Sequence, residues 1–176
     1  MPSILFVCTA NRFRSPLAAA LLWKYLAEVG IPEICDVLSA GTWARPGLPV
    51  MPDLVEIAWK LGIDLSRHRA RPVTSLLLSN CDLIVAMQAS HRETLLSENP
   101  DLEDRIYLLS EVVENRMYDI PDLGGTAENT LEIAADLDLL IREGTHSLCA
   151  LAIGLSRTRP NPGPLTCKNV LNLSTL

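Results

Sequence analysis

The sequence predicts an α/β protein built as a three-layer sandwich, with a central four-stranded parallel sheet that is doubly wound by helices on both faces. Three observations lead to this fold class. Strand-like stretches alternate with helix-like stretches, the strand-like stretches are continuously apolar, and neither a repeat nor a second domain interrupts the alternation. Strands without an alternating polar face are buried on both sides, which is the arrangement of a parallel sheet between helices.

The first half of the chain is expected to supply two strands and two helices. Residues 3–7 (SILFV) form the first buried strand. A helix is expected over residues 16–29, because a proline suits its first turn and a glycine follows its end. Residues 34–41 form the second strand. A loop rich in proline and glycine separates that strand from a helix over about residues 53–61.

The second half is expected to continue the alternation. Residues 81–87 (CDLIVAM) form the third strand. The helix behind it is expected to begin with Ser90 as N-cap, since Glu93 three residues later completes a capping box. Residues 105–109 form a short fourth strand, and residues 127–143 have the apolar spacing of a helix.

The domain organisation is expected to be simple. Residues 1–146 hold all the predicted elements and form one domain. Residues 147–176 contain three of the twelve prolines and no acidic residue. We interpret this segment as a loosely attached C-terminal extension.

Composition excludes several classes of function. The chain has 176 residues, of which 48% are hydrophobic, and a net charge of −6, so it is long and apolar enough for a full core but is a poor nucleic-acid binder. No apolar run approaches the about 20 residues of a membrane span, and the N-terminal apolar run is too short for a signal peptide. The five cysteines include no C-x-x-C pair, so we expect no metal, no disulfide framework and a cytoplasmic location.

The turn after the first predicted strand carries the candidate site. It reads VCTANRFRSP over residues 7–16, so a buried strand ends on Cys8 and Arg14 follows six positions later. The N–H groups of such a turn and of the helix behind it converge on one point and bind an anion. A guanidinium matches two oxygens of a phosphate. The expected phosphate-binding residues are Thr9, Ala10, Asn11, Arg12, Phe13, Arg14 and Ser15.

The same positive field stabilises a thiolate, which makes Cys8 the candidate nucleophile. Ser15 is expected to donate a hydrogen bond to the sulfur and help it leave. A cysteine taken alone is more often an inert buried residue, but here the anion-binding features surround it.

Together these residues resemble the low-molecular-weight protein tyrosine phosphatase family over about residues 3–145. The family pattern V-C-x-G-N-x-C-R-S-P corresponds to VCTANRFRSP, and its S-A-G-T corresponds to residues 39–42. Many bacterial members have H-R-A-R after G-I-D-x-S, as in residues 62–71 (GIDLSRHRAR). The resemblance implies a flavodoxin-like fold. It also implies phosphomonoester hydrolysis, foremost of phosphotyrosine in proteins, through a cysteinyl-phosphate intermediate and without a cofactor.

Residue roles follow from the resemblance by position. It implies that Cys8 is the nucleophile and Arg14 the phosphate clamp. It further implies a network that holds the loop in a strained shape, for which asparagine is suited because it tolerates a left-handed backbone. The members of this supporting network are Asn11, Ser15, Ser39 and His68. Arg69 and Arg71 are interpreted as surface charge.

Cleavage of a phosphate ester also needs a general acid for the leaving oxygen. The family supplies it as an Asp in a D-P motif before the last helix. The corresponding loop here is YDIPDLGG, which is one residue shorter than D-I-x-D-P-x-G-G and lacks the proline after Asp122. Asp122 is the candidate acid and Asp119 the alternative. Both would be ordinary turn aspartates if the loop did not reach the site.

The phosphate loop departs from the family pattern at three positions. Ala10 replaces a glycine, and Phe13 replaces a second cysteine that in many members traps the nucleophile as a disulfide. Arg12 borders the mouth of the site, where it favours acidic substrates and repels a phosphoarginine guanidinium, or else points to solvent. Few aromatic residues are placed to stack on a phosphotyrosine ring. Trp43 is the candidate substrate lip beside Arg12.

Three other functions stay open on the sequence. A phosphoarginine phosphatase or a thiol-dependent arsenate reductase would use the same loop, and the reductase would need two further cysteines, for which Cys81 and Cys149 are the candidates. A weakly catalytic phosphoprotein-binding module is the third. The expected partner is a phosphorylated protein or a small phosphomonoester, and not a nucleic acid or a membrane.

Overall fold

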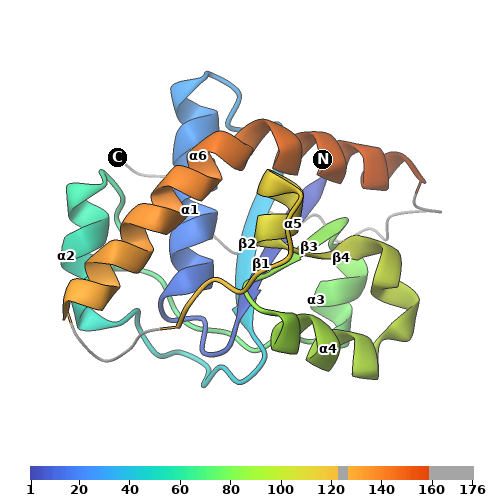
Figure 1. Cartoon of the computed structure of the whole chain (residues 1–176), viewed down its shortest axis with the longest axis horizontal. Helices are drawn as coiled ribbons and strands as arrows, with labels where there is room; N and C mark the ends of the chain where they lie inside the picture. The colour runs from blue at the N-terminus through green and yellow to red at the C-terminus, as the bar shows by residue number, and fades with distance from the viewer. Residues whose placement is uncertain (123–126, 159–176) are drawn as a thin grey trace.

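The centre of the molecule is a sheet of four parallel strands in the order β2-β1-β3-β4. The computed structural model describes residues 1–122 and 127–158 (Figure 1). The strands are β1 (Ser3–Cys8), β2 (Asp36–Gly41), β3 (Leu83–Ala86) and β4 (Ile106–Leu108). The predicted α/β class and the four-stranded parallel sheet are therefore confirmed.

Helices cover both faces of this sheet. They are α1 (Arg14–Glu28), α2 (Pro52–Lys60), α3 (Ser75–Asn80), α4 (Ala89–Glu98), α5 (Leu109–Glu114) and α6 (Ala127–Thr158), with a 3₁₀ helix, η1 (Pro100–Arg105). Ile4 and Phe6 of β1 point into an apolar cluster under α1 and α6, whereas Leu5 and Val7 point into a second cluster on the face of α3 and α4. Figure 1 shows α6 crossing α1 on one face and α3 and α4 on the other.

Several expected element boundaries differ from the structure. Three short helical segments, α3, α5 and η1, were not predicted. The capping box at Ser90 is wrong, because α4 begins at Ala89 and its N-cap is Gln88, two residues before Ser90, without a side-chain cap bond. The carboxylate of Asp119 instead accepts a hydrogen bond from the Ala89 N–H at 2.8 Å. A residue distant in sequence thus supplies the cap.

The last helix is longer than predicted. It runs to Thr158 rather than to residue 143, and Leu148, Cys149 and Ala152 are buried in the main core cluster. The boundary expected at residues 146/147 therefore falls inside α6, and residues 147–158 are not loosely attached. Residues 159–176 lie outside the described part. Among the helices that the structure describes, α6 included, none combines the length and apolar character needed to span a membrane.

Two glycines of α6 offer a matched test of its packing. A Cβ at Gly144 would lie 2.3 Å from Val113 Cγ2 of α5, whereas a Cβ at Gly154 would meet no atom within 4 Å. We expect Gly154→Ala to raise the free energy of unfolding by up to about 1 kcal/mol through helix propensity. Gly144→Ala should lower it by about 1–2 kcal/mol, because overpacking outweighs the same gain. Urea unfolding measures both, and equal stability of the two variants would contradict the packing of α5 on α6.

The order of the strands locates a site at one edge of the sheet. The chain passes from β1 to β2 on one side, then crosses back to β3 on the other side of β1. In such sheets the crevice outside the carboxyl ends of the strands, where the order reverses, is where ligands bind. Cys8 is the last residue of β1 and so lies at this point.

Candidate active site

The phosphate loop, residues 8–15, joins β1 to α1 at this edge. The carbonyls of Cys8 and Thr9 accept hydrogen bonds from the N–H groups of Thr42 and Trp43, both at 2.9 Å. The loop also passes directly over Gly41, where a Cβ would lie 2.4 Å from the carbonyl oxygen of Thr9. A side chain at position 41 would therefore push the loop out of place.

Asn11 is the central support of the loop. It is fully buried and has a φ of 53°, in the left-handed region that asparagine tolerates. Its Nδ2 donates to Ser15 Oγ at 3.0 Å and to Ser39 Oγ at 2.9 Å. Its Oδ1 accepts from the Arg71 N–H at 3.0 Å. Because every polar atom of the amide is engaged, the strained turn is held from three segments of the chain.

His68 closes this network from the far side of β2. Its Nε2 lies 2.8 Å from the Asn11 carbonyl oxygen, which can only accept, so Nε2 carries the proton. Burial lowers the pKa of His68, and the bond to Asn11 offsets part of this effect. Arg71, interpreted from sequence as surface charge, instead donates from Nε to the Ser39 carbonyl at 2.7 Å.

Cys8 and Ser15 face each other across the loop. The Cys8 sulfur is buried and lies 3.0 Å from Ser15 Oγ, which lies 3.1 Å from the Ala40 carbonyl oxygen. Ser15 has one hydroxyl hydrogen for these two acceptors. With a protonated thiol the S–H donates to Ser15, and with a thiolate the hydroxyl can turn to the sulfur. The geometry therefore supports either protonation state of Cys8.

Arg14 is a buried cation beside the loop, only 2% exposed. Its Nη1 donates to the Ile120 carbonyl at 3.0 Å, and its Nη2 lies 2.7 Å from Asp122 Oδ2. Nη2 also lies 3.5 Å from Thr9 Oγ1. The planar guanidinium is thus fixed at one end by a backbone carbonyl, while its other end faces a carboxylate at the edge of the loop.

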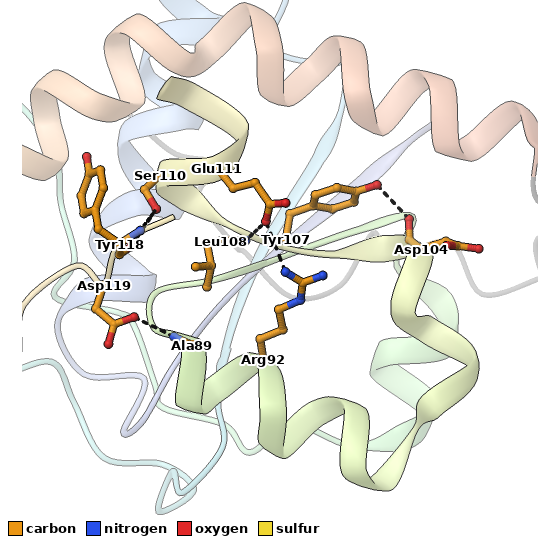
Figure 2. A network of polar contacts seen from close by, with 9 residues as sticks. All are labelled: Ala89, Arg92, Asp104, Tyr107, Leu108, Ser110, Glu111, Tyr118 and Asp119. Atoms are coloured by element: carbon orange, nitrogen blue, oxygen red, sulfur yellow. Dashed lines mark hydrogen bonds and ion pairs between the residues drawn. The ribbon is translucent and has the colours of Figure 1, made fainter. Parts of the chain in front are cut away.

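The acid loop, residues 118–122, is fastened to the same edge of the sheet. Ser110 Oγ donates to the Tyr118 carbonyl at 2.7 Å and accepts from the Tyr118 N–H at 3.1 Å. The Ile120 N–H donates to the Met87 carbonyl at 2.8 Å. Figure 2 shows Asp119 turned toward the Ala89 N–H at the start of α4. Of the two candidate acids, Asp122 therefore lies beside Arg14 and Asp119 caps a helix.

The remaining predicted residues of the loop and its surroundings differ in their environment. Ala10 is exposed and Phe13 is buried in the core cluster at the start of α1. Arg12 Nε donates to the Pro49 carbonyl at 2.7 Å, which holds this side chain against the neighbouring loop rather than free in solvent. Trp43 is 81% exposed and lines a cavity of about 230 Å³ together with residues of α3 and α4.

Sequence reasoning missed one buried residue that contacts the loop. His91, in the first turn of α4, has its Nε2 2.9 Å from Thr9 Oγ1. Burial, and after it the Arg14 guanidinium, lower the pKa of His91 to about 4, while Asp122 and Asp119 act in the opposite direction. Its place just after β3 could have pointed to it, because the carboxyl ends of parallel strands share one edge. Within residues 1–122 and 127–158, no cluster of three or more His, Cys, Asp or Glu residues could hold a metal ion.

This arrangement defines an open parallel α/β protein with a cysteine and a buried arginine in the turn after the first strand. The family model described as low molecular weight phosphotyrosine protein phosphatase matches residues 3–145. The chain therefore belongs to this family and is a hydrolase of the protein-phosphatase type, as the sequence motifs led us to expect.

Individual relatives agree with the family. The chain is 38% identical over 120 residues to a probable low molecular weight protein-tyrosine-phosphatase, EpsP, of Ralstonia nicotianae, a match that covers 68% of this chain and 77% of that protein. It is 32% identical over 141 residues to a protein-arginine-phosphatase of Bacillus subtilis, covering 80% and 92% of the two chains. The crystal structure of a YwlE mutant from Bacillus subtilis superposes with a TM-score of 0.78 at 31% identity, covering 84% of this chain and 99% of that one.

Proposed function

We propose that the protein hydrolyses phosphotyrosine in proteins, with Cys8 as nucleophile, Arg14 as phosphate clamp and Asp122 as general acid. The observation that carries this proposal is the approach of three groups to one loop. Cys8 Sγ lies 3.0 Å from Ser15 Oγ, and the Arg14 guanidinium lies 2.7 Å from Asp122. A nucleophile, an anion clamp and a proton donor are the groups that phosphoryl transfer to a cysteine requires.

In the first step the loop N–H groups and the Arg14 guanidinium bind the phosphoryl oxygens. The Cys8 thiolate attacks phosphorus, a sulfur–phosphorus bond forms, and the bond from phosphorus to the ester oxygen breaks. Asp122 in its protonated form gives its proton to that oxygen, so the product leaves as an alcohol or phenol.

In the second step the same carboxylate serves as a base. Asp122 takes a proton from a water molecule whose oxygen attacks the phosphocysteine, inorganic phosphate leaves, and the Cys8 thiolate returns. The Ser15 hydroxyl, which can turn from the Ala40 carbonyl to the sulfur, stabilises the leaving thiolate. The reaction needs Cys8 in its reduced form, which fits a reducing cytoplasm.

Trp43 and Arg12 are the proposed contacts for the substrate around the phosphate. The exposed indole of Trp43, tied by its backbone to Thr9, offers an aromatic surface for a phosphotyrosine ring. Arg12 adds a positive charge that favours acidic residues next to the phosphorylated one. The same loop also accepts small aryl phosphates, for which only the phosphate contacts are needed.

Phosphoarginine is the second candidate substrate, because a protein-arginine-phosphatase is among the similar proteins. The guanidinium of Arg12 argues against it. Its Nε bond to the Pro49 carbonyl holds the side chain beside the loop, where it would repel the guanidinium of a phosphoarginine.

A substrate panel tests this choice. We expect turnover of phosphotyrosine peptides to exceed that of phosphoserine and phosphoarginine peptides by at least about tenfold, and Arg12→Gln to raise phosphoarginine turnover selectively by a few fold. Arg45→Gln, which removes the same charge from an exposed position of the neighbouring loop, is the matched control. A wild-type preference for phosphoarginine would overturn the assignment and the role given to Arg12.

The arsenate reductase alternative has little geometric support. Cys81 is buried in the cluster on the α3 and α4 face, whereas Cys149 is buried in the cluster on the opposite face. Cys149 is instead paired with Cys35, next to the amino end of β2, and this neighbour together with burial raises the pKa of the Cys35 thiol. All four described cysteines are free thiols, and Cys81 and Cys149 lie on opposite faces of the sheet, so these two are not placed to exchange a disulfide with each other.

The binding-module alternative is separated from an enzyme by one assay. Turnover of p-nitrophenyl phosphate by the wild-type protein supports the proposed hydrolase. Tight binding of a phosphotyrosine peptide without turnover would instead support a module that recognises phosphoproteins.

A further inference from the structure

His91 is a buried histidine that the proposed reaction does not use. It lies on the first turn of α4 and is 4% exposed. Its Nε2 contacts Thr9 Oγ1 at 2.9 Å, while its Nδ1 is buried and has no hydrogen-bond partner among the described residues. A buried unpaired nitrogen costs stability, and such groups in native proteins commonly mark a functional constraint.

His91 is linked to Arg14, the proposed phosphate clamp, through the hydroxyl oxygen of Thr9. Thr9 Oγ1 lies between His91 Nε2 at 2.9 Å and Arg14 Nη2 at 3.5 Å. Arg14 can only donate, so the Thr9 oxygen is its acceptor. Because the low pKa of His91 keeps the imidazole neutral at pH 7, the pair adds no second positive charge beside Arg14. The imidazole acts on the clamp by fixing the Thr9 hydroxyl.

The same helix turn also holds the acid loop. The Ala89 N–H donates to Asp119 at 2.8 Å, and the carbonyl of Met87, just before α4, accepts from the Ile120 N–H at 2.8 Å. The Ile120 carbonyl in turn accepts from Arg14 at 3.0 Å. Figure 2 shows the acid loop reaching the start of α4 at Ala89. With the His91–Thr9 contact, hydrogen bonds connect the phosphate loop to α4, α4 to the acid loop, and the acid loop back to Arg14.

We propose that His91 is a positioning residue, which through the Thr9 hydroxyl orients Arg14 for phosphate. This inference rests on the proposed function for the role of Arg14 in catalysis. Its direct prediction is the affinity of the loop for inorganic phosphate, which is measured without any turnover. An isosteric loss of the bond should weaken that affinity, whereas the fold should tolerate the change. Removing an unpaired buried nitrogen in favour of an apolar side chain should leave stability equal or higher.

The test is a double-mutant cycle read by calorimetric binding of inorganic phosphate. We expect His91→Leu and Thr9→Val each to weaken phosphate binding about tenfold, and the double variant to be no weaker than either single one. His91→Gln, whose amide can reach Thr9 Oγ1 much as Nε2 does, should bind within about threefold of wild type. Thr145→Val, which removes a hydroxyl that donates to the Ile141 carbonyl within α6, is the control. The melting temperature of His91→Leu should match or exceed that of wild type.

Each other outcome counts against the proposal. The proposal would be overturned if His91→Leu bound phosphate with wild-type affinity, or if the two substitutions weakened binding independently, so that the double variant bound more weakly than either single one. It would also be overturned if His91→Gln did not keep near-wild-type affinity, or if the wild-type protein bound no phosphate. If His91→Leu does not fold, His91→Met takes its place, and failure of both to fold would make His91 a structural residue only. A wild-type protein that binds phosphate but hydrolyses no phosphomonoester would refute the proposed function, while the cycle would still decide the role of His91.

Discussion

Replacing Cys8 with serine should abolish phosphatase turnover while leaving the fold and the phosphate site in place. Serine has nearly the same shape, and its hydroxyl can keep the 3.0 Å contact with Ser15. An alcohol without an adjacent base is a far weaker nucleophile than a thiolate, so we expect kcat on p-nitrophenyl phosphate to fall by about four orders of magnitude or more. Steady-state kinetics with the purified full chain measures this.

The control is another buried cysteine. Cys81→Ser changes the same atom on the face of α3 and α4, away from Cys8, so its kcat should stay within about threefold of wild type while its stability drops. Phosphate binding by Cys8→Ser, measured by calorimetry, separates loss of the nucleophile from loss of the loop. Retained turnover in Cys8→Ser would rule out a cysteinyl-phosphate intermediate.

The second large effect is expected at Asp122, and its size should depend on the leaving group. Asn has the shape of Asp but cannot donate a carboxyl proton, so Asp122→Asn should lower kcat on phenyl phosphate about 100- to 1000-fold. The loss on p-nitrophenyl phosphate should be smaller, because p-nitrophenolate leaves without needing a proton. Binding of phosphate should not weaken, since the variant removes a carboxylate 2.7 Å from the Arg14 guanidinium.

Asp119→Asn distinguishes the two candidate acids. Its carboxylate accepts from the Ala89 N–H at the start of α4, so the main loss should be about 1 kcal/mol of stability from the cap and the helix dipole. Any fall in kcat should be equal for phenyl phosphate and p-nitrophenyl phosphate. A loss that grows with poorer leaving groups in Asp119→Asn, and not in Asp122→Asn, would exchange the two roles.

These expectations share one structural basis. The acid loop is anchored at three successive residues, by Ser110 to Tyr118, by Ala89 to Asp119, and by Met87 and Arg14 to Ile120. Asp122 follows this anchored stretch by two residues and meets Arg14. The loop is one residue shorter than the family pattern, yet these hydrogen bonds hold it so that the Asp122 carboxylate lies beside Arg14.

Much of the fold could be predicted from local sequence patterns. Three of the four strands lie within the stretches expected from their apolar runs and β1 extends one residue further, to Cys8, because buried parallel strands need apolar side chains on both faces. The start of α4 and the length of α6 could not be predicted in the same way. The α4 cap comes from Asp119, and the extra turns of α6 are stabilised by burying Leu148 and Ala152, both of which are contacts between distant segments.

The residues of the candidate site likewise fall into those that the sequence could predict and those that it could not. Cys8, Arg14 and Ser15 could be proposed from sequence alone, because the candidate nucleophile, clamp and hydrogen-bond donor all lie in one turn between a strand end and a helix start, where anions bind. The supporting roles of Ser39 and His68 came from family motifs, and both contact Asn11. The sequence did not indicate Arg71, whose side chain resembles any surface charge until its partners are known.

By itself the sequence determined the class of fold and the residues of the loop at Cys8 for which we propose chemistry, because both depend on residues that are neighbours in the chain. Only the tertiary structure decided which aspartate lies beside Arg14, that Gly41 must lack a side chain under the loop, and that His91 touches Thr9. Each of these contacts joins segments that meet only because parallel strands end at one edge of the sheet. Distances of a few ångströms there depend on how the whole core packs, which local patterns do not encode.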